Sequence, residues 1–371
     1  MTAAVTTAAK RGGGAEMKKG CIVAAALLLA AGVIYFAAGG KTAAPVEVTD
    51  ENFRLGTYVR LRLVGNDRKF LERELGAADA EMTRLEGLFS ANIASSDISR
   101  VNGAGGEWVK VAPETAALIK RSLQIALETD GAFDPAIGRL VRLWGIGTDA
   151  ARVPSAAEIK GALRSGGYKN VKVKETGGAS YVKVQSGQWL DLGAIAKGRI
   201  ADMLRDKLTA AGVKHAIIDL GGNLAVLGVS PAGRPWLLGL QQPYRPRGEY
   251  FGVVEVSDRS VVTSGPYERF FEREGVRYHH IFDPATGYPA QSGFDSVSVI
   301  DRDSARADAL CTALFVMGRA KAEKFLENDR DIAAVFVLDS EKRVLVTPAA
   351  RRLFKLTDKD FRVEVIGGDA E

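Results

Sequence analysis

The stretch IIDLGGNLAVLG, residues 217–228, decides the fold class because it places two short apolar runs on either side of a Gly-Gly pair. Each run is long enough for a strand, and Gly221 and Gly222 let the backbone reverse direction in a tight turn. A second pair of alternating runs, VKVKETGGASYVKV at 171–184, surrounds another Gly-Gly. Such hairpins join antiparallel strands, so they argue against a purely parallel, doubly wound sheet.

Helical and strand-like patterns alternate along the rest of the chain. Apolar residues recur at helical spacing from Leu71 to Phe89, and Pro113 begins a segment that should be helical to about Glu128. Further helices are expected at about 196–211 and 304–317. Strands are expected at 57–65, 216–220, 224–229, 236–241, 251–256, 295–300, 333–339 and 343–347, the last two as a pair. The pattern predicts an α/β (α+β) protein with mixed or antiparallel sheets and packed helices.

The N-terminal segment differs from the rest of the chain. CIVAAALLLAAGVIYFAA, residues 21–38, is an uncharged apolar run of membrane-spanning length, preceded by Lys10, Arg11, Lys18 and Lys19. Positively charged flanks stay in the cytoplasm. We therefore expect a single-pass protein of the inner (cytoplasmic) membrane, with its remainder extracytoplasmic or periplasmic. Small residues at 37–40 leave a cleaved signal sequence as an alternative, and Met17 could be the true start.

These features divide the chain into a basic cytoplasmic segment at 1–20, the apolar segment at 21–38, a linker at 39–52 and one folded domain at 53–366. The formal net charge of the 371 residues is +5, and no basic stripe carries interleaved aromatic residues, so nucleic-acid binding is disfavoured. Neither Cys21 nor Cys311 indicates a disulfide or a zinc site.

Two segments carry groups suited to an anionic substrate. In ARADALCTALFVMG, 305–318, Asp308 and Thr312 stand four residues apart, so one helical face presents a carboxylate and a hydroxyl, which suit Mg²⁺. A helix cap or a salt bridge is the alternative. In LDLGAIAKGRIADML, 190–204, Lys197 near a helix start could help to hold a phosphate, although the spacing is not that of a phosphate-binding P-loop.

Two further segments combine turn residues with aromatic or titratable groups. In TDGAFDPAIGRLVRLWGIG, 129–147, the loop beside Phe133 and Trp144 could receive a flat ring system, or it could be a plain turn. In YHHIFDPATGYPA, 278–290, the adjacent histidines should project differently and no third zinc ligand is near, so a zinc site is disfavoured.

Taken together and in this order, the segments resemble the ApbE family of FAD:protein FMN transferases over about residues 55–350. The resemblance implies a T-fold-like architecture and a Mg²⁺-dependent reaction. FAD is cleaved, FMN is attached to a threonine or serine hydroxyl of an acceptor flavoprotein through a phosphoester, and AMP is released. The matching segments are LFSANIASSDISRVN (88–102), TDGAFDPAIGRLVRLWGIG, LDLGAIAKGRIAD, IIDLGGNLAVLG, VVTSGPYERFFEREGVRYHHIFDPATGYPA (261–290) and ADALCTALFVMG.

The same resemblance assigns the site residues. Asp308, Thr312 and the backbone carbonyl of Ala194 would bind Mg²⁺. The resemblance matches His280 to the histidine of the family's motif. Because imidazole suits proton transfer near neutral pH, His280 or the nearby Asp283 would remove the proton from the acceptor hydroxyl. His279, which should face the other way along a strand, is interpreted as incidental. The residues that would contact FAD are Ala132, Phe133, Asp134, Asp191, Lys197, Thr263, Ser264, Gly265 and Ile281.

Two departures from the family pattern concern positions that tend to touch FAD. Leu55-Gly56-Thr57 replaces Met-Gly-Thr, so Leu55 keeps an apolar contact, whereas Asn92 replaces a tyrosine and loses its ring. The acceptor motif Asp-x-x-Thr/Ser-Gly-Ala-Thr/Ser is absent, so the chain is expected to be the enzyme rather than its own target. An FAD pyrophosphatase and a non-enzymatic flavin-binding protein remain the alternatives.

Overall fold

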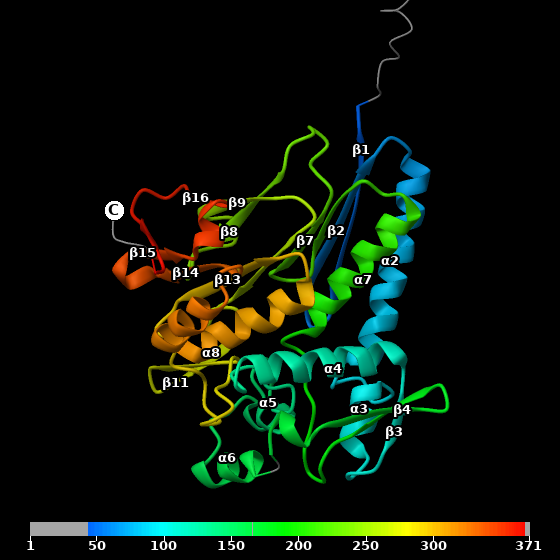
Figure 1. The fold of residues 1–371 in the computed structure, drawn as a ribbon, viewed down its shortest axis with the longest axis vertical. Helices are drawn as coiled ribbons and strands as arrows, with labels where there is room; N and C mark the ends of the chain where they lie inside the picture. The colour runs from blue at the N-terminus through cyan, green and yellow to red at the C-terminus, as the bar shows by residue number, and fades with distance from the viewer. Residues whose placement is uncertain (1–43, 165, 368–371) are drawn as a thin grey trace, which may run out of the picture. The chain divides into compact units, whose positions relative to one another are not determined.

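A large sheet forms the centre of the fold in this computed structural model, which describes residues 44–164 and 166–367 (Figure 1). In that part of the chain the sheet has nine strands in the order β1-β2-β6-β7-β10-β13-β14-β15-β17. Every neighbouring pair is antiparallel except β15–β17. The strands are β1 (Val46–Arg54), β2 (Thr57–Gly65), β6 (His215–Asp219), β7 (Asn223–Leu227), β10 (Ser260–Ser264), β13 (Ser296–Asp301), β14 (Ala333–Leu338), β15 (Arg343–Val346) and β17 (Arg362–Val365).

Three smaller sheets and a set of helices complete the described part. The sheets are β16-β9-β8, β3-β5-β4 and β11-β12. Their strands are β3 (Val109–Val111), β4 (Lys172–Thr176), β5 (Ala179–Lys183), β8 (Trp236–Gln241), β9 (Tyr250–Val256), β11 (Phe270–Arg273), β12 (Val276–His279) and β16 (Phe354–Leu356). The α-helices are α2 (Arg68–Phe89), α3 (Asp97–Gly103), α4 (Pro113–Glu128), α5 (Gly138–Trp144), α6 (Ala156–Leu163), α7 (Ala196–Ala211), α8 (Ser304–Asn328) and α9 (Pro348–Arg351).

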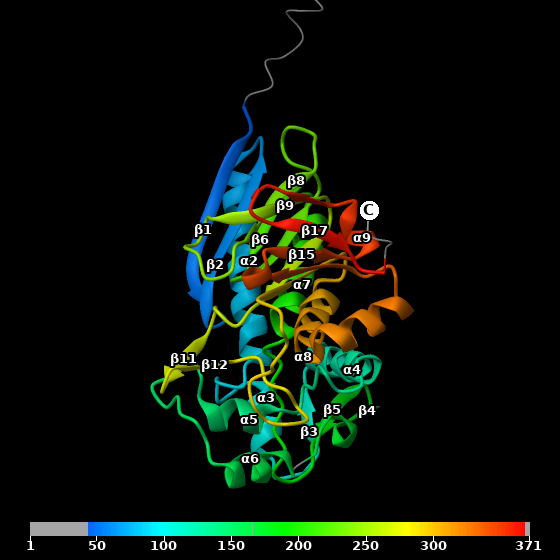
Figure 2. The same cartoon turned by 90° about the vertical axis from the view of Figure 1, so that its left-hand side faces the viewer.

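The large sheet is covered on both faces at β14, as the alternation along this strand shows. Phe336 belongs to the main core, which α2, α7 and α8 supply from one side. Its neighbours Val335 and Val337 belong to a second core, which includes Trp236 and Phe251 of the β16-β9-β8 sheet on the other side. A strand that is buried on both faces reads as a continuous apolar run. Figures 1 and 2 show the helices and the small sheet on opposite faces.

The lower part of the molecule is built from the segments between β2 and β6. Helices α3 to α6 and the β3-β5-β4 sheet lie below α8 and the lower end of α2 (Figure 1). A separate apolar cluster holds α5 and α6 together through Leu140, Trp144 and Ile159, and it includes Phe282 from the segment after β12. This cluster brings two of the glycine-rich and aspartate-rich segments of the sequence into contact.

Most of the predicted elements are present. The helices at 113–128 and 196–211 have the predicted bounds, and the paired runs at 333–339 and 343–347 are the neighbouring strands β14 and β15. The helix predicted at 304–317 is present and ends at Gly318, whose backbone is not helical (φ 67°), and a second helical segment of α8 continues to Asn328. The predicted mixture of helices with antiparallel and mixed sheets is confirmed.

One predicted boundary is wrong. Residues 46–52, assigned to the linker, belong to β1, which pairs with β2 along its whole length from Val46 to Arg54. Its alternation of half-buried and exposed residues made it resemble a polar linker. Among the helices at 44–164 and 166–367, none is long and apolar enough to cross a membrane. The predicted anchor at 21–38 lies outside the described residues.

Candidate functional site

The start of α7 meets the first turns of α8 at a glycine. The Gly198 N–H donates to Asp308 Oδ2 at 2.9 Å. A Cβ at position 198 would lie 2.2 Å from the Ser304 carbonyl oxygen, so only glycine lets the two helices approach this closely. Asp308 therefore accepts one of the N–H groups that the start of a helix leaves without an intrahelical partner.

A lysine and a carboxylate are paired at this meeting point. Lys197 Nζ lies 3.8 Å from Asp308 Oδ1, and the two side chains are 21% and 5% exposed. The ammonium also donates to the Gly193 carbonyl at 3.1 Å. Burial of a carboxylate is costly unless the charge is paired and hydrogen-bonded, and Asp308 has both kinds of partner. The structure thus brings together Lys197 and Asp308 from segments that lie far apart in the sequence.

The residues predicted to bind Mg²⁺ lie on α8 and in the turn just before α7. Thr312 follows Asp308 by one turn of α8 and is half-buried, and Ala194 lies in the turn just before α7. Asp308 Oδ2 is occupied by Gly198, so Oδ1 is the oxygen that faces the lysine. Within the described ranges no group of three or more His, Cys, Asp or Glu side chains could hold a metal. Mg²⁺ commonly binds one or two carboxylates together with substrate phosphates and water, so one carboxylate fits this ion.

His280 follows β12 directly and has a defined tautomer. Its Nδ1 lies 3.1 Å from the Arg269 carbonyl oxygen. Because a carbonyl only accepts, Nδ1 carries the proton and Nε2 keeps its lone pair. Burial, with a smaller effect of the nearby Arg269 guanidinium, lowers the pKa of His280 to about 3. Lys197 also contributes to this lowering of the pKa, which places the lysine and the histidine in one electrostatic environment.

His279 is a core residue whose ring has other partners than that of His280, as expected for neighbouring residues of a strand. The side chain is 7% exposed, and the ring makes an edge contact with Phe315 of α8 at 5.7 Å between centroids. Nε2 donates to the Ala290 carbonyl at 3.2 Å, and Nδ1 accepts from the Ile281 N–H at 3.3 Å. Burial lowers its pKa to about 4. His279 therefore fixes the segment that presents its neighbour, and Ile281 is buried in the same core.

The end of β10 lies against α8 beside these groups. The Cys311 thiol of α8 donates to the Val262 carbonyl at 3.3 Å. The next three residues are Thr263, Ser264 and Gly265, of which Thr263 shares a hydrogen bond of 2.7 Å with the Ser298 hydroxyl. Because Cys311 lies three residues after Asp308, the predicted Thr-Ser-Gly turn is placed close to the carboxylate.

The other predicted contacts on this edge belong to turns at the same end of the large sheet. Leu55 has a positive φ of 54° in the two-residue turn between β1 and β2, and its N–H donates to Glu86 Oε1 at 2.9 Å. Thr57 follows it and packs so tightly on Gly221 that a Cβ there would lie 2.2 Å from its hydroxyl oxygen. Asn92 is exposed just beyond the end of α2.

The two aromatic rings expected beside the loop of Ala132, Phe133 and Asp134 are buried. Phe133 is 2% exposed in the main core, and Trp144 is fully buried in the separate cluster of α5 and α6. Neither ring is therefore exposed beside the loop in this structure. Asp134 accepts from the Ala136 N–H at 2.7 Å and from the Tyr168 N–H at 3.1 Å, and burial raises its pKa. Its carboxylate therefore ties its own loop to the distant backbone at Tyr168.

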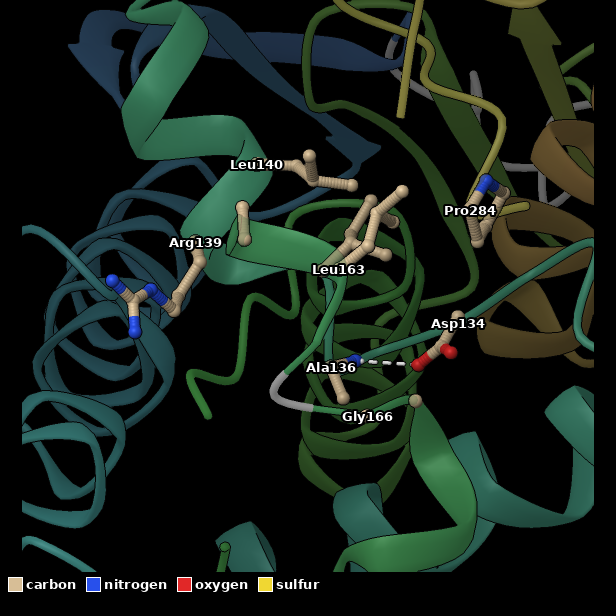
Figure 3. Close-up of a pocket in the computed structure, with 10 residues that line it drawn as sticks. Asp134, Ala136, Arg139, Leu140, Leu163, Gly166 and Pro284 are labelled. Carbon is tan, nitrogen blue, oxygen red and sulfur yellow. Dashed lines mark hydrogen bonds between the residues drawn. The ribbon is translucent and has the colours of Figure 1, made fainter. Parts of the chain in front are cut away.

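A small pocket of about 40 Å³ lies beside this loop, as Figure 3 shows. Leu140, Leu163 and Pro284 line it, and the hydrogen bond between Asp134 and Ala136 is at its edge. Pockets for small-molecule ligands usually measure several hundred Å³, whereas this volume suits water. Neither Lys197 nor Asp308 lines the pocket, so it is distinct from the group that they form.

Two more predicted residues serve turns. Asp283 accepts from the Ala285 N–H at 2.9 Å and from the Thr286 hydroxyl at 3.1 Å, and Trp144 Nε1 donates to the Gly287 carbonyl of the same turn at 2.9 Å. Asp191 accepts from the Gly193 N–H at 2.7 Å and so shapes the turn before α7. Both oxygens of Asp283 are thus engaged within its own turn.

Arg269 is the residue that the sequence interpretation missed. Its carbonyl orients His280, and it precedes the hairpin of β11 and β12, in which Phe270 pairs with His279. The alternating runs around Glu274-Gly275 are a hairpin signal that could have placed these strands.

Comparison with known proteins identifies the family. The model of the ApbE family matches residues 55–336. The chain is 39% identical to an FAD:protein FMN transferase of Treponema pallidum, over 84% of this chain and 89% of the relative. It is 37% identical to one of Klebsiella pneumoniae, over 83% and 94%.

Solved structures agree with this match. The ApbE protein of Thermotoga maritima superposes with a TM-score of 0.76 at 35% identity, covering 83% of this chain and 99% of that one. The apo flavinyl transferase ApbE of Pseudomonas stutzeri superposes with a TM-score of 0.73 at 29% identity, covering 83% of this chain and 97% of that one. The match thus extends over most of the described fold and includes Lys197, His280 and Asp308. This chain therefore belongs to the ApbE family.

Proposed function

We propose that this chain is an FAD:protein FMN transferase that moves FMN from FAD to a threonine or serine hydroxyl of an acceptor protein and releases AMP. The names of its relatives in Treponema pallidum and Klebsiella pneumoniae support the transfer of FMN. One observation on this chain carries the proposal. Lys197 and Asp308 come from distant segments and lie 3.8 Å apart, and the charge of Lys197 acts on His280 of a third segment.

The cationic and acidic groups suit a pyrophosphate. Lys197 would contact the phosphate oxygens, and its charge would stabilise negative charge on them as the P–O bond breaks. Asp308 Oδ1, the Thr312 hydroxyl and the Ala194 carbonyl would hold Mg²⁺. When bound, Mg²⁺ would supply additional positive charge beside the pyrophosphate.

His280 is placed to handle the proton. Its Nδ1–H is held by the Arg269 carbonyl, so Nε2 is the atom that can accept the proton of the acceptor hydroxyl. A pKa of about 3 makes the free imidazole a weak base. A nearby pyrophosphate carries negative charge and would raise that pKa, so the binding of FAD would itself strengthen the base.

The transfer exchanges one P–O bond for another. The acceptor oxygen forms a bond to the phosphorus of the FMN half, while the bond from that phosphorus to the bridging oxygen breaks. AMP leaves with the bridging oxygen and the electron pair, and the hydroxyl proton passes to His280. The loops that would hold the rest of FAD are the turns at Leu55, Thr263 to Gly265 and Ala132 to Asp134, with Asn92 and Asp191 beside them.

The test is to incubate the purified protein with FAD and Mg²⁺, with and without an acceptor that carries the Asp-x-x-Thr-Gly-Ala-Thr sequence. We expect denaturation-resistant flavin on the acceptor and an equal amount of AMP, both dependent on Mg²⁺. Free FMN with unmodified acceptor would instead indicate a pyrophosphatase, and intact FAD would indicate a binding protein. His280→Ala should bind FAD like the wild type but transfer FMN about two to four orders of magnitude more slowly, whereas Lys197→Ala should mainly weaken FAD binding.

The location of the enzyme is a further part of the proposal. The basic residues before the apolar run at 21–38 support an anchor in the inner membrane, with the catalytic domain on the periplasmic side. The acceptor would then be an extracytoplasmic flavoprotein domain.

A further inference from the structure

Two buried aspartates cap each other's helices where α7 meets α8. Asp202 of α7 accepts from the Ser304 N–H with Oδ1 at 2.9 Å and from the Ala305 N–H with Oδ2 at 3.0 Å. In return, Asp308 of α8 accepts from the Gly198 N–H of α7 at 2.9 Å. Each helix thus offers its first N–H groups to a carboxylate of the other, and the two helices are locked in one register.

The surroundings of Asp202 show that this arrangement is built into the core. The residue is 6% exposed, and Arg205 Nη2 donates to its Oδ1 at 2.9 Å. The Ser304 hydroxyl donates to the Asn223 side-chain oxygen of β7 at 3.0 Å, which ties the same turn of α8 to the sheet. Burial raises the pKa of Asp202 to about 6, because the carboxylate has lost most of its water.

Helix formation alone does not require Asp202. α8 has its own N-cap, Asp303, whose Oδ1 accepts from the Arg306 N–H at 2.8 Å. An N-cap of this kind satisfies the first turn from within the helix. The bonds of Asp202 add a connection to α7. They begin at Ser304, four residues and about 6 Å of helix before Asp308.

We propose that Asp202 is a positioning residue of the transfer site. By holding the first turn of α8 on α7, it sets the place of Asp308 and Thr312 relative to Lys197. The inference rests on the proposed function, in which these three side chains hold the pyrophosphate and its metal ion. Outer-shell partners of metal ligands typically contribute about 10- to 100-fold in affinity or activity.

The test compares Asp202→Asn with a control, Asp303→Ala, which removes the helix's own N-cap and its ion pair with Arg121 of α4 but leaves the connection between α7 and α8. Asparagine has nearly the same shape, but its NH₂ group would face one of the two N–H donors, so one bond is lost. Binding of Mn²⁺, as a paramagnetic substitute for Mg²⁺, is measured by EPR with no acceptor present. kcat and the melting temperature are measured in parallel.

We expect the Mn²⁺ affinity and the kcat of Asp202→Asn to fall by about 10- to 100-fold. Asp303→Ala should have a lower melting temperature, but its Mn²⁺ affinity and kcat should stay near those of the wild type. Wild-type Mn²⁺ affinity and kcat in a folded Asp202→Asn protein would overturn the proposal. An equal loss in both variants would also overturn it, because the effect would then follow stability alone.

A second variant covers the case in which Asp202→Asn does not fold. Asp202→Glu keeps the charge but adds one methylene, so it should shift the first turn of α8 and weaken Mn²⁺ binding while the protein stays folded. Unchanged Mn²⁺ affinity in this variant would contradict the positioning role. Failure of the proposed function is a separate outcome, because it would appear as a wild-type protein that modifies no acceptor, whereas the Mn²⁺ comparison between wild type and variants could still be made.

Discussion

Replacement of His279 by glutamine should make the stability of this protein less sensitive to acid. Both ring nitrogens of His279 are engaged in the neutral form, because Nε2 donates to the Ala290 carbonyl and Nδ1 accepts from the Ile281 N–H. Protonation would remove the acceptor and set two N–H groups against each other. The ring also packs on Phe315, away from water.

The size of the effect follows from the two pKa values. Burial lowers the pKa of His279 from its ordinary 6.5 to about 4 in the folded protein. The folded-state pKa is depressed, so the stabilisation is complete above pH 6.5 and is lost as the pH falls toward 4. By pH 5 the loss is about 2 kcal/mol, from linkage of these values at 1.36 kcal/mol per pH unit.

The assay is urea unfolding of the wild type and His279→Gln, followed by circular dichroism at pH 7, 6 and 5. The variant should be about 1–3 kcal/mol less stable at pH 7 through lost hydrogen bonds and packing. That difference should shrink by about 2 kcal/mol at pH 5. Asp202 has a raised pKa of about 6, so its protonation stabilises the folded protein as the pH falls. This effect is present in both proteins and cancels in the comparison. A difference that stays constant from pH 7 to pH 5 would refute the reasoning.

Three further predictions concern the metal ligand, the aromatic cluster and the topology. Asp308→Ala should abolish FMN transfer in a protein that is still folded by circular dichroism, and added Mg²⁺ should restore little; near-normal turnover at limiting Mg²⁺ would contradict the assignment. Trp144→Ala should cost about 3–5 kcal/mol in urea unfolding, because a fully buried indole and its bond to the Gly287 carbonyl are lost; a loss below about 1 kcal/mol would speak against that packing. A reporter that works only outside the cytoplasm, fused after Glu371, should be active, and activity of a cytoplasm-only reporter instead would exclude the proposed orientation.

The sequence by itself determined the elements whose cause is local. Proline at the first position and apolar spacing fixed α4 from Pro113 to Glu128, and the two Gly-Gly turns fixed the hairpins of β4 with β5 and β6 with β7. These signals depend on neighbours within a few residues, so they can be recognised without the rest of the chain. β1 was not predicted, because its strand pattern is weak and its burial depends on packing against distant elements.

The tertiary structure decided which of the candidate residues act together. Nothing local distinguishes Asp308, which meets Gly198 and Lys197, from Asp283, whose oxygens are engaged in its own turn. Nor does it distinguish Asp134, whose oxygens accept from Ala136 and from the distant Tyr168. Likewise, the roles of His279 and His280 follow from different partners, one in the core and one at the Arg269 carbonyl. A side chain's chemistry is set by its burial and by the partners that long-range packing supplies, and sequence spacing does not contain that information.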